Sequence, residues 1–139
     1  MISSSIFFIT IRIYIKLLPL SSIFAFKVKI ILRMDRIAQL KDFIEKYPED
    51  MFSRHALAME YLKVGNESQA EEVMRSLLAD DPHHTGTYYH LGKLLEKAGR
   101  IDEAIAVYEE GIQFCQRLAA HNDLRELKGA LVLIKEDDL

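Results

Sequence analysis

Four of the five histidines lie between positions 55 and 90, close enough in the sequence to raise the question of a metal site. Imidazole nitrogens are common ligands for zinc and copper, but a zinc site needs three or four ligands that converge. His83 and His84 are expected in a turn, and nothing in the sequence predicts that they meet His55 and His90. We therefore expect no metal site and no other cofactor.

Neighbouring pairs of carboxylates are the other side chains whose spacing could serve chemistry, as a general acid and a general base. They are Glu71–Glu72, Asp102–Glu103 and Glu109–Glu110. All three pairs lie in segments with a helical pattern, where adjacent side chains point about 100° apart and do not face one another. The sequence also has no glycine-rich phosphate loop and no nucleophile motif. It therefore predicts a protein that is not an enzyme.

Charged residues are distributed unevenly along the 139 residues. Residues 1–33 contain five basic side chains and no acidic one, which leaves 13 basic and 21 acidic side chains in residues 34–139. An acidic body argues against a nucleic-acid partner, because binding phosphates requires clustered lysine and arginine. The single cysteine, Cys115, rules out an intramolecular disulfide and fits a reducing compartment such as the cytoplasm.

Two stretches, residues 61–74 and 94–108, nearly repeat one another. Three pairs of residues recur at an interval of 34 positions: Gly65 and Gly99, Ala70 and Ala104, and Pro48 and Pro82. Within each interval the hydrophobic residues recur at three and four positions, which predicts two amphipathic helices. A glycine would end the first helix and a proline would follow the second.

The same pattern predicts the individual helices. In the first interval we expect helices at 51–64 and about 67–80, with Asn66 capping the second. In the next interval we expect one helix from near Thr85 to Gly99 and another from near Ile101. The small residues would lie where paired helices cross closely, because larger side chains would push the helices apart. These are Ala58, Ala70, Gly92 and Ala104.

A 34-residue period with this helix–turn–helix content resembles the tetratricopeptide repeat family. The positions that match the family's preferences are Tyr61, Ala70, Tyr88, Leu91–Gly92, Ala104 and Tyr108. Arg54 stands where the family prefers an aromatic residue, and Gln116 replaces the closing proline of the second repeat. The resemblance covers two repeats, at about 51–84 and 85–118. It implies an all-α fold, a right-handed superhelical stack of antiparallel helix pairs.

Helices on both sides of the repeats are expected to cover their apolar faces. Residues 34–47 are interpreted as the second helix of a preceding unit, with Asp35 as its cap. At the other end we expect the last repeat helix to continue through Ala120, because Gln116 replaces the proline. A capping helix at about 122–136 would follow, with Asn122 or Asp123 as its cap. Val132 and Leu133 lie off its apolar stripe; we expect them to widen the core contact, with an exposed patch as the alternative.

Residues 1–33 differ in composition from the rest. A membrane-spanning helix needs about 20 apolar residues, and Arg12, Lys16 and Pro19 interrupt this segment. A membrane partner is therefore not expected unless the segment is a real anchor. A targeting segment and a lone strand are further interpretations. We favour a mis-assigned start, with the native protein beginning at Met34 and residues 34–139 forming the helical domain.

A binding surface is what remains for function. In the family that the sequence resembles, the first helices of the repeats line a concave groove that accepts a peptide or helix of a partner protein. Carried over by position, the groove would comprise Phe52, His55, Met59, Lys63, Tyr89, Lys93, Glu96 and Lys97, with Leu62 beside them. The lysines would make this face locally basic. The alternative for these residues is structural, with Phe52, Met59 and Leu62 packed against flanking helices and the lysines only solvated.

The resemblance therefore implies an adaptor that binds another protein. The alternative is a structural or self-association module that forms a homodimer through its groove or its terminal helix. Some members of the family hold a terminal carboxylate with a lysine and asparagine clamp. We expect no such clamp here, because the corresponding positions hold His55, Met59 and His90.

Overall fold

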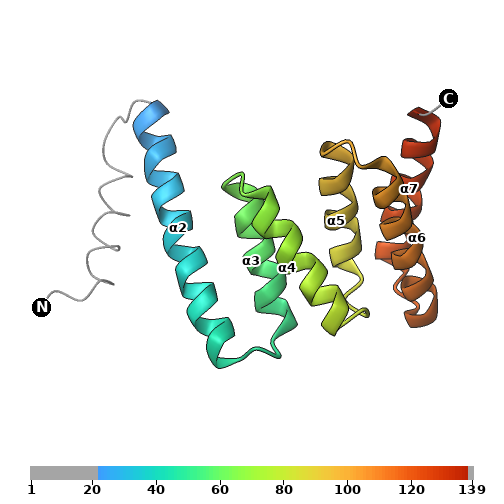
Figure 1. Ribbon diagram of the computed structural model, residues 1–139, viewed down its shortest axis with the longest axis horizontal. Helices are drawn as coiled ribbons and strands as arrows, with labels where there is room; N and C mark the ends of the chain where they lie inside the picture. The colour runs from blue at the N-terminus through green and yellow to red at the C-terminus, as the bar shows by residue number, and fades with distance from the viewer. Residues whose placement is uncertain (1–21, 138–139) are drawn as a thin grey trace, which may run out of the picture. The chain divides into compact units, whose positions relative to one another are not determined.

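The computed structural model describes residues 22–137, and the remaining residues at both ends lie outside its described part. Within that range the chain forms α-helices and no strand (Figure 1). They are α2 (Ser22–Lys46), α3 (Met51–Lys63), α4 (Glu67–Asp80), α5 (Gly86–Lys97), α6 (Ile101–Leu118) and α7 (His121–Asp137). The predicted all-α class is confirmed.

The chain divides into two compact units, residues 1–36 and 37–139. α2 contributes to both units, and in the second unit its Ile37 is buried in the core. Asp35 lies in the interior of α2, so the prediction that it caps a helix is wrong. None of the helices in the described range combines the length and the apolar character needed to cross a membrane.

The ends of the repeat helices follow local signals in the sequence. The Asp50 side chain accepts a hydrogen bond from the backbone N–H of Ser53 at 3.2 Å, and Asn66 does the same for Gln69 at 3.3 Å. Each satisfies a donor that the first turn of a helix leaves open. Gly65, which follows α3, has a φ of 79°, a left-handed conformation that glycine adopts without strain. The predicted roles of Asn66 and Gly65 are confirmed.

Successive helices of the second unit pack against one another in antiparallel pairs. α3 packs on α4, α5 on α6, and α6 on α7, while α5 also contacts α4 and α7. The core runs through all of these helices. Its largest fully buried side chains are Met74, Leu77, Tyr88, Leu91, Leu95, Tyr108 and Leu127.

Two glycines allow α5 and α6 to approach closely. A Cβ atom at Gly92 of α5 would lie 2.1 Å from Cε1 of Tyr108, and one at Gly111 of α6 would lie 2.6 Å from Cβ of Tyr88. The two helices therefore exchange contacts, since a tyrosine of each one packs on a glycine of the other. Ala58, Ala70 and Ala104 are fully buried, as the prediction of close crossings requires.

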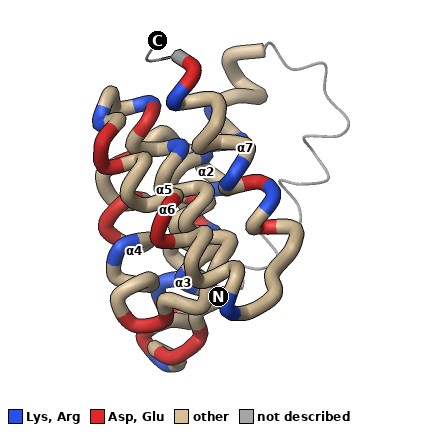
Figure 2. Tube along the Cα trace, turned by 90° about the vertical axis from the view of Figure 1, so that its right-hand side faces the viewer, with Lys and Arg blue, Asp and Glu red and all other residues tan. Residues whose placement is uncertain are grey.

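Four charged side chains join α4 to the start of α6. Arg100 contacts Glu71 at 2.8 Å, and Arg75 contacts Glu103 at 3.0 Å, so each arginine reaches a carboxylate of the other repeat. Arg100 also bonds to Glu103 at 2.6 Å, and this bond lowers the pKa of that carboxyl. Figure 2 shows acidic and basic segments interspersed along the helices in this way.

The structure corrects the prediction for the C-terminal part. α6 ends at Leu118 because Ala119 takes a left-handed conformation with a φ of 54°, so the helix does not continue through Ala120. α7 then begins at His121, which places Asn122 and Asp123 inside it. Neither caps the helix as predicted; the Asp123 carboxylate instead accepts a hydrogen bond from the Thr85 hydroxyl.

Val132 and Leu133 are also placed differently from the main expectation. They are 54% and 59% exposed, respectively, so they do not widen the core contact. The residues of α7 that do face the core are Leu127, Ala130 and Ile134. The alternative prediction, an exposed patch on α7, is the one that agrees with the structure.

Candidate partner-binding surface

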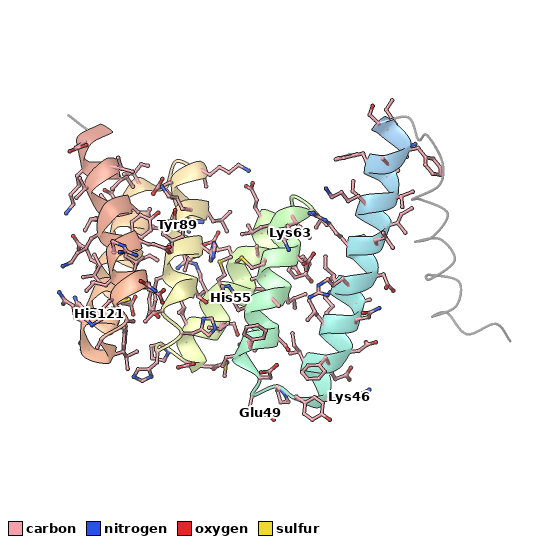
Figure 3. All side chains as sticks on the ribbon, turned by 180° about the vertical axis from the view of Figure 1, so that it is seen from behind. Lys46, Glu49, His55, Lys63, Tyr89 and His121 are labelled. Carbon is pink, nitrogen blue, oxygen red and sulfur yellow. The ribbon has the colours of Figure 1, made fainter. Side chains whose placement is uncertain are left out.

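We call the eight residues predicted to bind a partner the first-helix face. They all lie on α3 and α5, the first helices of the two repeats: Phe52, His55, Met59, Lys63, Tyr89, Lys93, Glu96 and Lys97. Figure 3 labels three of them, His55 and Lys63 on α3 and Tyr89 on α5. A hydrogen bond between His55 and Thr87 joins the two helices.

The apolar members of this face differ in how far the core uses them. Phe52, in the first turn of α3, is 76% exposed. Met59 and Leu62 are partly buried and pack against the core, as the structural alternative predicts. Tyr89 is also partly buried, and its ring meets that of His90 edge to face with the centroids 5.7 Å apart.

Each of the three lysines forms an ion pair with a glutamate. Lys63 pairs with Glu60 at 2.8 Å and Lys93 with Glu96 at 2.9 Å, both within one helix. Lys97 pairs with Glu67 of α4. The expectation of a locally basic face is therefore wrong, because the positive charges are balanced where they lie.

Glu96 also ties the face to the interior. Its carboxylate accepts a hydrogen bond from the hydroxyl of Tyr108 at 2.5 Å, and the Tyr108 ring is fully buried. Burial and this bond raise the pKa of Tyr108, so the phenol stays protonated. Glu96 thus supports the pairing of α5 with α6, and only part of its hydrogen-bonding capacity remains for a partner.

Three histidines that were predicted not to converge do meet beside this face. The Nδ1 atoms of His55 and His84 lie 2.9 Å and 2.8 Å from the hydroxyl oxygen of Thr87. The ring centroid of His55 lies 4.9 Å from that of His84 and 5.5 Å from that of His90. We call these four residues the histidine cluster. His83 lies apart, with its ring 5.6 Å from that of Phe114.

The electrostatics of the cluster favour the uncharged forms of His55 and His90. The pKa of His55 is lowered to about 4, chiefly by burial and further by the neighbouring His84 and His90. Burial also lowers the pKa of His90, although the carboxylate of Glu126 on α7 opposes this effect. A threonine hydroxyl has one hydrogen to donate and two lone pairs to accept with, so at least one of the two Nδ1 atoms donates to Thr87.

The cluster does not form a metal site. Among residues 22–137 no group of three or more histidine, cysteine, aspartate or glutamate side chains is arranged to hold a metal ion. The sequence signal for the cluster was the 35-residue spacing of His55 and His90, close to the repeat period. That spacing puts both on first helices, but it does not predict that His84 and Thr87 join them.

Comparisons with known proteins agree with this architecture. The sequence model of a tetratricopeptide repeat family matches residues 61–131. A search among curated proteins finds no match. The solution structure of a tetratricopeptide repeat domain protein from Salinibacter ruber is 44% identical, with a TM-score of 0.62, over 64% of this chain and 90% of that one.

Two further solved structures are similar. The crystal structure of a tetratricopeptide repeat domain protein from the same organism is 42% identical, with a TM-score of 0.61, over 63% of this chain and 97% of that one. A protein from Bordetella parapertussis is 22% identical, with a TM-score of 0.64, over 73% of this chain and 89% of that one. At that identity it supports the fold alone.

Tetratricopeptide repeats serve in general as protein-interaction modules, and proteins built from them are in general scaffolds and not enzymes. The 34-residue period, the nested helix pairs and the matching family model lead to one conclusion: the chain belongs to the tetratricopeptide repeat family.

Proposed function

We propose that the chain is an adaptor that binds a peptide or helix of a partner protein on its first-helix face. The observation that carries the proposal is a row of four rings that crosses both repeats. Tyr89 contacts His90, His90 contacts His55, and His55 contacts His84, with centroids 5.7, 5.5 and 4.9 Å apart. All four side chains are partly exposed, so the row is accessible along its length.

The chemistry of this row indicates how a partner would bind. Burial favours the uncharged form of His55 and His90, and the three lysines beside the row are paired with glutamates. We therefore expect binding through ring contacts and hydrogen bonds, with exposed Phe52 as an apolar anchor. Salt screens exposed charges, so the affinity should change little with ionic strength.

Affinity purification of the full chain with mass spectrometry tests the proposal. We expect Tyr89→Ala and Lys93→Glu to lose the partner that the wild-type chain retains, because one removes a ring and the other unbalances the charge of α5. Tyr47→Ala and Lys46→Glu are matched controls at exposed positions near the end of α2, and they should retain it. Circular dichroism confirms that each variant is folded. Unchanged partners in both test variants would refute the first-helix face.

Self-association is the second candidate function, and a different observation favours it. α7 exposes Val132 and Leu133, and nothing in residues 22–137 covers them. Static light scattering over a range of concentrations distinguishes the two functions, because a constant monomer mass speaks against self-association and leaves the adaptor proposal intact.

A further inference from the structure

α7 has a stripe of exposed residues on the side opposite the core. The buried residues of the helix are Leu127, Ala130 and Ile134. The exposed stripe consists of Arg125, Gly129, Val132 and Glu136, at spacings of four, three and four residues. These spacings align side chains along one face of an α-helix. α7 ends the series of helices in Figure 1, and no helix of the described chain follows it.

The middle of this stripe has room for a second helix. A Cβ atom at Gly129 would find no atom within 4 Å, so the backbone is open to solvent there. Val132 lies one turn further along and is 54% exposed. A glycine beside a β-branched apolar residue lets another helix approach closely and leaves an apolar side chain to fill the contact.

The charges at the ends of the stripe are complementary to those of a reversed copy. A twofold axis between Ala130 and Leu131 would place Gly129 opposite Val132 of the partner subunit. The same axis would place Arg125 opposite Glu136 of the partner subunit. The Arg125–Glu136 contact joins a positive to a negative charge and occurs twice by symmetry, and Figure 2 shows both signs along α7.

We propose that α7 pairs antiparallel with α7 of a second copy of this chain, through the stripe Arg125, Gly129, Val132 and Glu136. The contact is isologous, because the same surface serves both subunits. The inference rests on the self-association candidate and does not depend on the first-helix face. One helix from each subunit buries less surface than a standard interface, so the dimer forms weakly and only at high protein concentration.

Sedimentation equilibrium of the full chain at low salt tests this pairing, over concentrations from about 10 µM to about 1 mM. The wild-type chain should show a reversible monomer–dimer equilibrium. Arg125→Glu and Glu136→Arg should each weaken it about tenfold, because each reverses two symmetry-related ion pairs. The double variant with both reversals should recover the wild-type constant. Residues 125 and 136 are about 16 Å apart along one helix, so only pairing between copies explains such recovery.

Matched controls place the reversals elsewhere on the surface. Lys46→Glu on α2 and Glu72→Arg on α4 are exposed single reversals that should leave the constant unchanged. Val132→Glu should abolish the dimer independently, because it places a carboxylate in the apolar centre of the contact. Circular dichroism should give the same helicity for every variant.

The results for the wild-type chain and its variants distinguish self-association in general from pairing through α7. A wild-type chain that stays monomeric over the whole range refutes both self-association and α7 pairing. A wild-type dimer that neither reversal weakens, or that the double variant fails to restore, refutes α7 pairing and leaves self-association through another surface.

Discussion

Gly92 shows how a single residue sets the distance between two helices. The side chain of Tyr108 occupies the space where a Cβ atom at this position would lie, and its hydroxyl is held by Glu96. The ring cannot withdraw without giving up that hydrogen bond, so even one added methyl group strains the pair. The sequence placed Gly92 at a close crossing, but it did not reveal that Tyr108 fills the space.

We expect Gly92→Ala to destabilise the fold by about 1–3 kcal/mol, the usual cost of overpacking a core. The matched control is Gly129→Ala, which adds the same methyl group to an open position of α7. There alanine should stabilise the helix by about 0.5–1 kcal/mol, because glycine loses more backbone freedom on folding. Urea denaturation measures both free energies of unfolding. Equal effects of the two substitutions would contradict the close crossing.

At the scale of helices, the boundaries of α3, α4 and α5 and the start of α6 agree with prediction to within two residues, because their signals are local. Asn66, Gly65 and the residues around the prolines act within one turn of where they stand. Local signals were less reliable at the two flanks. Asp35 has the right chemistry for a cap but lies inside α2, and Ala119 stops α6 without glycine or proline.

The histidine cluster couples α3 to α5 in a manner that depends on pH. The pKa of His55 is about 4 in the folded chain, against an ordinary value of 6.5. Between these values the unfolded chain binds more protons, so the stability should be complete above pH 6.5 and decrease as the pH falls towards 4. The lowered pKa of His90 contributes with the same sign.

Thermal unfolding between pH 4 and pH 8 measures this dependence. We expect the wild-type midpoint to fall on acidification, and His55→Gln to flatten the fall because glutamine does not titrate in this range. His121→Gln, at the exposed start of α7, should follow the wild-type curve. Parallel curves for the wild type and His55→Gln would show that burial of His55 does not govern the acid response.

At the scale of the molecule, the described part of the second unit, residues 37–137, has one continuous core. Buried residues of α2 through α7 belong to a single cluster, in which each helix covers the apolar face of its neighbour. The two repeats alone would leave such faces exposed, and Ile37 of α2 and Leu127 of α7 cover them at the two ends. We therefore expect this unit to unfold cooperatively, without a separate transition for either repeat.

Met74→Ala tests that cooperativity, since Met74 is fully buried in α4. The cavity should cost about 2–5 kcal/mol, and it should shift the far-ultraviolet and tyrosine near-ultraviolet transitions together. Phe52→Ala removes an exposed apolar side chain and should change the stability by less than about 0.5 kcal/mol. Two separated transitions in Met74→Ala would contradict a single core.

The sequence by itself determined the repeat period, the type and bounds of the repeat helices, and the small residues at their crossings. These features depend on residues within a few turns of one another or on a strict interval, and both can be read along the chain. Only the tertiary structure decided which side chains meet across helices. It brought His55 to His84 and His90, paired Lys97 with Glu67, and left Val132 exposed. Such contacts depend on how far each helix is rotated and shifted against the next, which the packing of the whole core sets.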